Sequence, residues 1–312
     1  MLTIKLFEPN IDVRRAVPDG IIFSGYYQSS SPTEIQSVSN SGLFKITLHG
    51  NFTSSGALVT DYEMYRSGGT PLYSVSGLSE KYLGSFSTST GGFGLTTVPN
   101  LANTVPGQPI RVVGSDGNDQ VQPWSFNDLL FDGGNGTDTL KLRDTKSSHS
   151  IQREGDTITI KGPGGLGLIY KTTGVERIEF TDSAIAYDTA GNGGEAYRLY
   201  QAAFNRTPDK AGLGFQMKAL DNGATLKQVA QNFLNSPEFQ SAYGTNLADS
   251  QFVTQLYQNV LHRSPDASGL DFQIKALWSG TDRAQLLVNF SESPENQAAL
   301  IGVIQDGMAY TI

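Results

Sequence analysis

A repeat of 57 residues in the last third of the chain constrains the fold more than any other feature. Residues 199–223 read LYQAAFNRTPDKAGLGFQMKALDNG, and residues 256–280 read LYQNVLHRSPDASGLDFQIKALWSG. The match continues through FLNSPE and FSESPE, which end at Glu238 and Glu295, and needs no gap. A constant offset over this length marks a duplicated structural unit.

Each copy of the repeat predicts four short helices. Apolar residues at helical spacing predict an amphipathic helix over residues 195–205, which Pro208 stops. Asp209 is expected to cap a second helix and Gly223 to end it, since glycine accepts a left-handed turn. A third helix follows, and Ser236-Pro237-Glu238 has the composition of a fourth helix start. The residues expected on the apolar faces are Leu213, Phe215, Met217, Leu220, Val229 and Phe233, with Leu270 matching Leu213.

These residues resemble a family of helical repeats, a domain of unknown function attached to bacterial secreted proteins of the RTX type. The resemblance covers roughly residues 195–300. It implies an extracellular bacterial protein. It implies no reaction, because the family has no assigned one.

Two glycine-rich nonapeptides in the middle of the chain are the best signal of a site. Residues 114–122 (GSDGNDQVQ) and 133–141 (GGNGTDTLK) both fit the pattern G-G-x-G-x-D-x-U-x, the first with serine in second place. Glycine permits positive φ in the turn, the aspartate supplies a carboxylate, and the apolar residue buries the next strand. The copies start 19 residues apart, which resembles about one coil of a degenerate RTX β-roll with a one-residue insertion.

This resemblance implies a calcium site between the two turns, with one or two ions. Calcium takes six to eight oxygen ligands at about 2.3–2.6 Å. The alternative is a pair of metal-free Gly/Asp turns retained as structure. The expected ligands are the side chains of Asp116, Asp119, Asn135 and Asp138 and the carbonyl oxygens of Gly114, Gly117, Gly133 and Gly136.

Composition and missing motifs argue against several other functions. The net charge of −8 disfavours nucleic acid and anionic lipid as partners, and the absence of cysteine excludes disulfides and thiolate sites. Residues 162–167 (GPGGLG) satisfy GxGxxG, but a strand is expected on both sides, so they indicate a hairpin loop rather than a nucleotide site. No HExxH, GxSxG or Walker A motif is present, so no catalytic residue is predicted and no enzyme is expected.

The expected organisation is multidomain, with β structure followed by helices. We predict an N-terminal β domain over residues 1–106, a calcium-binding RTX-like β region over 107–188 and an α-helical tandem repeat over 189–312. The sequence TAGNGG at 189–194 has the composition of a flexible link. No apolar run has the length of a membrane-spanning helix, and the N-terminus lacks the pattern of a signal peptide.

The expected function is structural. We expect an extracellular protein, exported by a type I route, that associates with itself into a surface layer, filament or biofilm matrix. The first alternative is a carbohydrate-binding adhesin or lectin that contacts cell-surface or matrix polysaccharide. The second alternative is an enzyme acting on polysaccharide. The residues that motivate the adhesin are tyrosines on predicted strands: Tyr26, Tyr27, Tyr62, Tyr65 and Tyr73.

Overall fold

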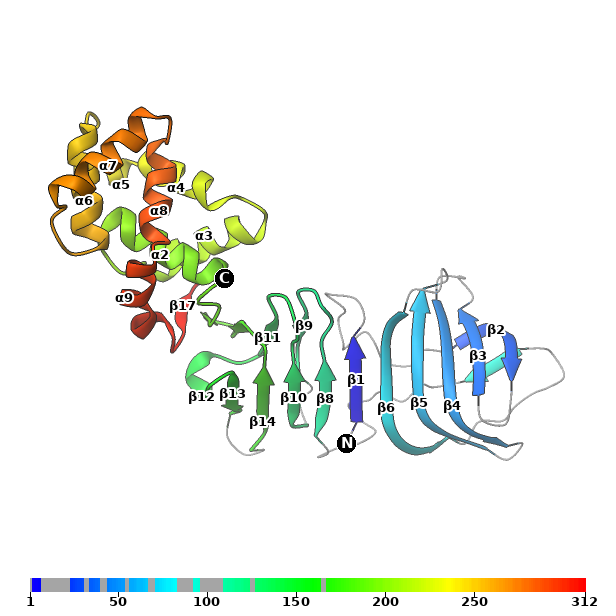
Figure 1. The fold of residues 1–312 in the computed structure, drawn as a ribbon. Helices are drawn as coiled ribbons and strands as arrows, with labels where there is room; N and C mark the ends of the chain where they lie inside the picture. Colours follow the sequence, from blue (N-terminus) through cyan, green and yellow to red (C-terminus); the bar gives the residue numbers. More distant parts are fainter. Residues whose placement is uncertain are drawn as a thin grey trace. The chain divides into compact units, whose positions relative to one another are not determined.

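The chain divides into two compact units, Met1–Thr181 and Asp182–Ile312. The first is built of β-strands and the second mostly of helices, which confirms the predicted fold class (Figure 1). The expected boundary at 106–107 lies outside the described residues. The computed structural model describes residues 2–6, 23–30, 34–39, 44–53, 56–66, 71–82, 92–95, 109–123, 127–163 and 167–312.

Seven strands precede residue 100 in the described part of the chain. All seven pair with antiparallel neighbours, and β1 also runs parallel to β8 (Ile110–Val113), the first strand of the next region. The apolar pattern is weakest in β3 and β7, where polar residues and glycine interrupt it. The strands are β1 (Leu2–Leu6), β2 (Phe23–Ser30), β3 (Glu34–Ser39), β4 (Phe44–Thr53), β5 (Gly56–Arg66), β6 (Pro71–Tyr82) and β7 (Gly92–Leu95).

Three rungs of parallel strands stack after residue 109. Ile110 pairs with Leu129 and Gln120 with Thr139, so the first two rungs repeat with the 19-residue offset found in the sequence. A hairpin of β12 (Ser150–Glu154) and β13 (Thr157–Lys161) is inserted before the third rung. The rungs are β8 (Ile110–Val113) with β9 (Gln120–Val121), β10 (Leu129–Asp132) with β11 (Thr139–Lys141), and β14 (Ile169–Thr173) with β15 (Arg177–Glu179).

The apolar side chains of the rungs form the core of this region. Alternate residues of β8 and β10 point inward, and Val121 and Leu140 lie buried on the parallel strands β9 and β11. Each fully buried residue of this size contributes roughly 1.5–3 kcal/mol relative to an exposed one. Residues no more than 1% exposed are Ile110, Val112, Val121, Leu129, Phe131, Leu140, Ile160 and Ile178.

Eight helices form the second unit, four from each copy of the repeat (Figure 1). Asp209 and Asp266 cap α3 and α7 by accepting from the backbone N–H of Gly212 and Gly269, as predicted. The helices are α2 (Asn192–Phe204), α3 (Lys210–Asp221), α4 (Leu226–Leu234), α5 (Pro237–Tyr243), α6 (Asp249–Val260), α7 (Ala267–Trp278), α8 (Arg283–Ser291) and α9 (Pro294–Ile304).

The predicted helical core is confirmed with one error. Leu213, Met217 and Leu220 are buried, and Leu270 is partly buried against the same core. Phe215 is 71% exposed, so its assignment to the buried face of α3 was wrong. It lies two residues from Leu213 and from Met217, which at 3.6 residues per turn places it on another side of the helix.

The expected flexible link at 189–194 was also wrong. The helix α2 begins at Asn192, and Gly193 and Gly194 are buried within its first turn. A β-carbon at Gly194 would lie 1.9 Å from the carbonyl oxygen of Thr189. The glycines are therefore required by close packing.

Two short strands close the second unit. β16 (Ala184–Ala186) runs antiparallel to β17 (Met308–Tyr310), so the first and last segments of the unit pair with each other. Thr311 donates its backbone N–H to the carbonyl of Lys210 at 3.0 Å and so approaches α3. Gly214 permits this approach, because a β-carbon there would lie 2.0 Å from the carbonyl oxygen of Thr311.

None of the helices in the described part of the chain combines the length and apolar character needed to cross a membrane.

Candidate metal centre

The two predicted turns lie against each other, and a third acid continues the stack. The backbone N–H of Asp119 donates to Oδ1 of Asp138 at 2.7 Å, and the backbone N–H of Asp138 donates to Oε2 of Glu176 at 2.8 Å. Asp119, Asp138 and Glu176 thus occupy equivalent places in the three rungs, and we call them the acid ladder. In the first rung, Oδ2 of Asp119 accepts a hydrogen bond from the backbone N–H of Ser115 at 2.6 Å.

Stacked glycines let backbone oxygens approach the acid ladder. A β-carbon at Gly114 would lie 1.9 Å from the carbonyl oxygen of Gly133. One at Gly133 would lie 2.1 Å from the carbonyl oxygen of Gly174 and 2.4 Å from Oδ2 of Asp138. In the same way, Gly136 faces the carbonyl oxygen of Gly117 and has a φ of 120°, a conformation natural to glycine. Carboxylate and carbonyl oxygens therefore gather at the same edge of the rungs.

Asp138 is buried at this edge, and its carboxyl group lies close to two other acids. Its side chain is 0% exposed, and its Oδ2 accepts no hydrogen bond from the described residues. Burial raises the pKa of its carboxyl to about 7; the backbone N–H of Asp119 lowers it, and the charges of Glu176 and Asp119 raise it further. A buried carboxylate in this position needs either a proton or a cation nearby.

The predicted ligands do not all lie at this edge. Asp119 and Asp138 are buried, but Asp116 and Asn135 are exposed and bond to each other, with Nδ2 of Asn135 donating to Oδ1 of Asp116 at 2.9 Å. Among the described residues, no three His, Cys, Asp or Glu side chains gather in a way that could hold a metal ion. A cation at this edge would therefore depend on backbone carbonyl oxygens as well as on Asp119 and Asp138.

Glu176 is the member of the acid ladder that sequence reasoning missed. The hairpin β12–β13 lies between the second and third rungs, so Glu176 follows Asp138 by 38 residues, twice the repeat. The sequence Thr-Gly-Val-Glu at 173–176 keeps one glycine and an acid but loses the nonapeptide pattern. The signal in the sequence is an acid that follows a single glycine and lies 38 residues, twice the 19-residue offset, after Asp138.

Of the tyrosines that motivated the adhesin, only Tyr65 has a described side chain. Its hydroxyl donates to Oε2 of Glu63, and this hydrogen bond raises the pKa of Tyr65 to about 12. The side chains of Tyr26, Tyr27, Tyr62 and Tyr73 lie outside the described ones.

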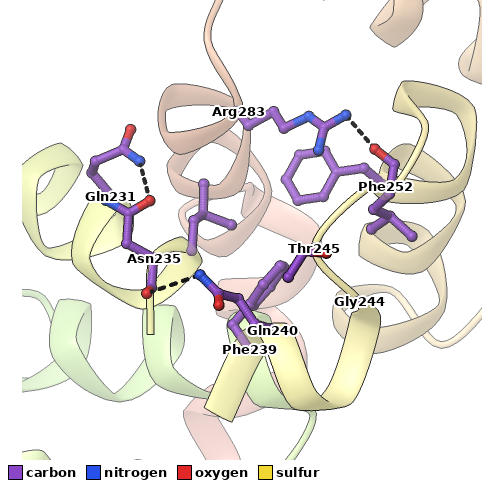
Figure 2. A pocket seen from close by; sticks show the side chains of 10 residues that line it. Gln231, Asn235, Phe239, Gln240, Gly244, Thr245, Phe252 and Arg283 are labelled. Atoms are coloured by element: carbon purple, nitrogen blue, oxygen red, sulfur yellow. Dashed lines mark hydrogen bonds between the residues drawn. The ribbon is translucent and has the colours of Figure 1, made fainter. Parts of the chain in front are cut away.

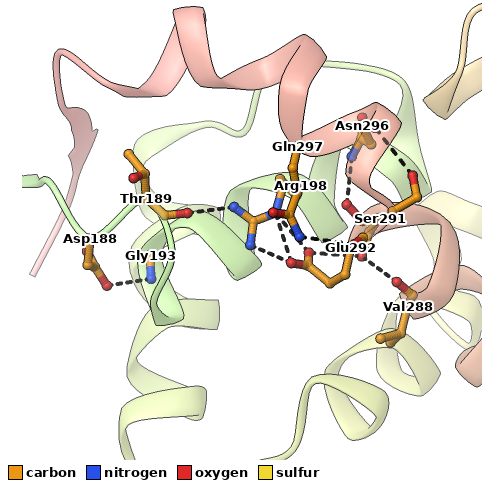
Figure 3. Close-up of polar contacts among 10 residues, drawn as sticks. Asp188, Thr189, Gly193, Arg198, Val288, Ser291, Glu292, Asn296 and Gln297 are labelled. Atoms are coloured by element: carbon orange, nitrogen blue, oxygen red, sulfur yellow. Dashed lines mark hydrogen bonds and ion pairs between the residues drawn. The ribbon is translucent and has the colours of Figure 1, made fainter.

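The second unit contains a separate ion pair between a buried arginine and a half-buried glutamate (Figure 3). Arg198, which is 4% exposed, donates its Nε to both carboxylate oxygens of Glu292 at 3.0 Å and its Nη1 to the carbonyl of Thr189 at 2.6 Å. Nearby, Oδ2 of Asp188 accepts from the backbone N–H of Gly193 at 2.7 Å. These bonds connect the start of α2 to the end of α8, which is a structural role.

The repeated corner arginines are also structural. Nη2 of Arg206 lies 2.9 Å from Oε1 of Glu238, and its guanidinium lies 4.9 Å from the ring centre of Tyr200. In the second copy, Arg263 makes the same pair with Glu295 at 3.1 Å. The internal partners of both arginines explain the motif Arg-x-Pro-Asp, at 206–209 and 263–266, as a corner between two helices.

Comparison with known proteins gives one match. Residues 230–300 match a family described as a domain of unknown function, DUF4214. The match spans the end of the first copy of the repeat and nearly all of the second. No curated protein matches the chain.

Proposed function

We propose that the chain is an extracellular bacterial structural protein that binds calcium at the acid ladder and assembles with further copies of itself. One observation supports calcium most directly. The buried Oδ2 of Asp138 accepts no hydrogen bond from the described residues. This oxygen and the carbonyl oxygen of Gly174 lie 2.4 Å and 2.1 Å from the point that a β-carbon of residue 133 would occupy. A bound cation would satisfy this oxygen and offset the repulsion between stacked carboxylates.

The donor set suits a hard divalent cation. The side chains of Asp119 and Asp138 and the carbonyl oxygens of the stacked glycines offer only oxygen, which calcium prefers over softer metals. Calcium also tolerates irregular arrangements of ligands, whereas magnesium demands a near-ideal octahedron. When bound, calcium would supply positive charge that holds adjacent rungs together. The proposal assigns the chain no reaction.

Titration calorimetry of the full chain with calcium chloride tests this part of the proposal. Extracellular calcium modules bind with dissociation constants of about 10⁻⁴–10⁻³ M, and we expect one or two ions in that range. Asp138→Asn should abolish or strongly weaken the heat of binding. Asp156→Asn removes the same charge from the exposed β12–β13 turn and is the matched control. Absence of calcium heat in the unaltered chain would refute the site.

The edges of the large sheet motivate the proposal of self-assembly. Its order begins at β12 and ends at β7 among the described strands, so each of these strands has one side without a neighbour in the sheet. Such edges offer backbone donors and acceptors to another chain. Two different edges on one molecule favour contacts that do not close, which produce filaments or layers.

Light scattering and electron microscopy across a calcium titration test the assembly. We expect monomers in micromolar calcium and large ordered particles in millimolar calcium, because bound calcium would order the rungs that precede β12. A chain that remains monomeric in millimolar calcium would contradict self-assembly. That outcome would favour the carbohydrate-binding adhesin, or the polysaccharide-acting enzyme if products appear.

A further inference from the structure

A hollow of about 370 Å³ opens in the second unit beside the first copy of the repeat. It lies between α4, α5, the loop that follows α5, and the first turns of α6 and α8. Figure 2 shows polar side chains from several of these elements around one space. Its lining consists of Gln231, Leu234, Asn235, Phe239, Gln240, Gly244, Thr245, Leu247, Phe252 and Arg283.

At one matching position, the second copy of the repeat carries a charged residue where the first copy carries an amide. The counterpart of Asn235 is Glu292, which holds the buried side chain of Arg198. Gln297 donates its Nε2 to the carbonyl of Glu292 at 3.0 Å. Gln240 makes the same bond to the carbonyl of Asn235 at 3.2 Å, so the local backbone is alike in both copies. The helical fold can therefore place a charged residue at this position, paired with the buried Arg198, and the first copy instead lines it with neutral amides.

The amides that line the hollow keep part of their bonding capacity. Nε2 of Gln231 donates to Oδ1 of Asn235 at 3.1 Å. Within the described residues, no protein group bonds to Oε1 of Gln231, Nδ2 of Asn235 or Oε1 of Gln240. Adjacent amide donors and acceptors of this kind match neighbouring hydroxyl groups, which both donate and accept.

The charge in the hollow is already neutralised. Nη2 of Arg283 lies 2.6 Å from Oδ1 of Asp249 and also donates to the carbonyl of Leu247 at 2.6 Å. The guanidinium stacks over the ring of Phe252 at 5.2 Å. Because Asp249 balances this cation, the site gives no advantage to a phosphate or a carboxylate.

The size and walls of the hollow narrow the ligand further. Sites for small molecules usually have volumes of about 300–1,000 Å³ with apolar walls and a few placed polar groups. This hollow is at the small end of that range, and the half-buried Leu234 and Leu247 supply the apolar wall, beside the buried rings of Phe239 and Phe252. We infer that it binds one or two units of a neutral sugar, with hydroxyls on the amides and the C–H face against the apolar wall. This site is separate from the acid ladder and does not depend on the calcium proposal.

The test is titration of the full chain, in chelator, with short neutral oligosaccharides of glucose, mannose, galactose and N-acetylglucosamine, followed by saturation-transfer NMR. Oligogalacturonate serves as the charged comparison. Gln231→Leu removes an amide from the hollow, and Gln240→Trp fills the space. Gln285→Leu is the matched control, because Gln285 makes the same bond to Asn289, at 2.9 Å on α8, and does not line the hollow.

We expect saturable binding of at least one neutral sugar. Affinity should fall at least tenfold in Gln231→Leu and Gln240→Trp and stay unchanged in Gln285→Leu, with helical circular dichroism retained in all three. No binding of any neutral sugar at millimolar concentration would overturn the inference. So would binding that both hollow variants retain, or equal binding of oligogalacturonate.

Discussion

Replacement of Asp138 by asparagine should remove a pH dependence from the stability of the first unit. The native carboxyl has a pKa of about 7 against an ordinary value of 3.8, so the folded chain keeps a proton that the unfolded chain releases. The free energy of unfolding should therefore be highest below pH 4 and fall as the pH rises to 7. At 1.36 kcal/mol per pKa unit, the loss reaches at most about 4 kcal/mol.

Asparagine keeps the shape of the side chain and cannot ionise. Its Oδ1 can still accept from the backbone N–H of Asp119, so the ladder retains that bond. At pH 8 in chelator, Asp138→Asn should therefore be more stable than the unaltered chain. In millimolar calcium the order should reverse, because only the carboxylate gains from the cation.

Hydrogen-exchange protection of the amides in β8, β10 and β14 localises this measurement to the rungs. Protection factors are compared at pH 5 and pH 8, each with chelator and with calcium, and Asp156→Asn is the control. Equal protection of the unaltered chain at both pH values in chelator would refute the account of Asp138. An equal response of Asp138→Asn to calcium would refute its role as a ligand.

Three further predictions concern packing. Gly133→Ala should disrupt the rungs, because its β-carbon would lie 2.1 Å from a carbonyl oxygen. In the control Gly162→Ala, the new β-carbon would meet no atom closer than 3.7 Å. Limited proteolysis should cleave only the first variant. Leu213→Ala should cost about 2–5 kcal/mol in urea unfolding of the helices, and Phe215→Ala, at a 71% exposed position, should cost less than about 0.5 kcal/mol. Arg198→Ala should cost about 1–3 kcal/mol, since it removes the charged partner of the half-buried Glu292; a thermal melt shifted by less than 2–3 °C, roughly the effect of 1 kcal/mol, would contradict this.

The helices and the first two rungs could be predicted from the sequence, because repeated motifs determine them. The 57-residue repeat and its Asp and Ser caps predicted the helices, and the 19-residue offset predicted the pairing of the first two rungs. These features depend on residues close in sequence. The two copies also match in their backbone after α2 and α6, where Asn205 and its counterpart His262 share a φ of 51° in the left-handed region.

The motifs did not predict features that depend on close packing or on elements inserted between the repeats. Glu176 lies 38 residues after Asp138 because the β12–β13 hairpin is inserted between their rungs, and the pairing of β11 with β15 still brings it into the acid ladder. The glycines at 193 and 194 suggested flexibility, because nothing nearby reveals that Thr189 and Asp188 pack against them. The hollow depends on which helices meet around Asn235, and a repeat pattern alone predicts both copies to be alike.

The pairing of β16 with β17 also decides how the second unit would respond to a pulling force. Ala184 lies opposite Tyr310, so both ends of the unit emerge at the same side of this strand pair. A force applied through the flanking chain would separate the backbone bonds one after another, as in a zipper, which needs less force than shearing them together. The rest of the helices would be loaded only after this pair and the neighbouring bond from Thr311 to Lys210 on α3 had opened. Each residue then released would add about 3.3–3.6 Å of length. In the proposed extracellular assembly under tension, the short strand pair would therefore extend first and the helical repeat afterwards.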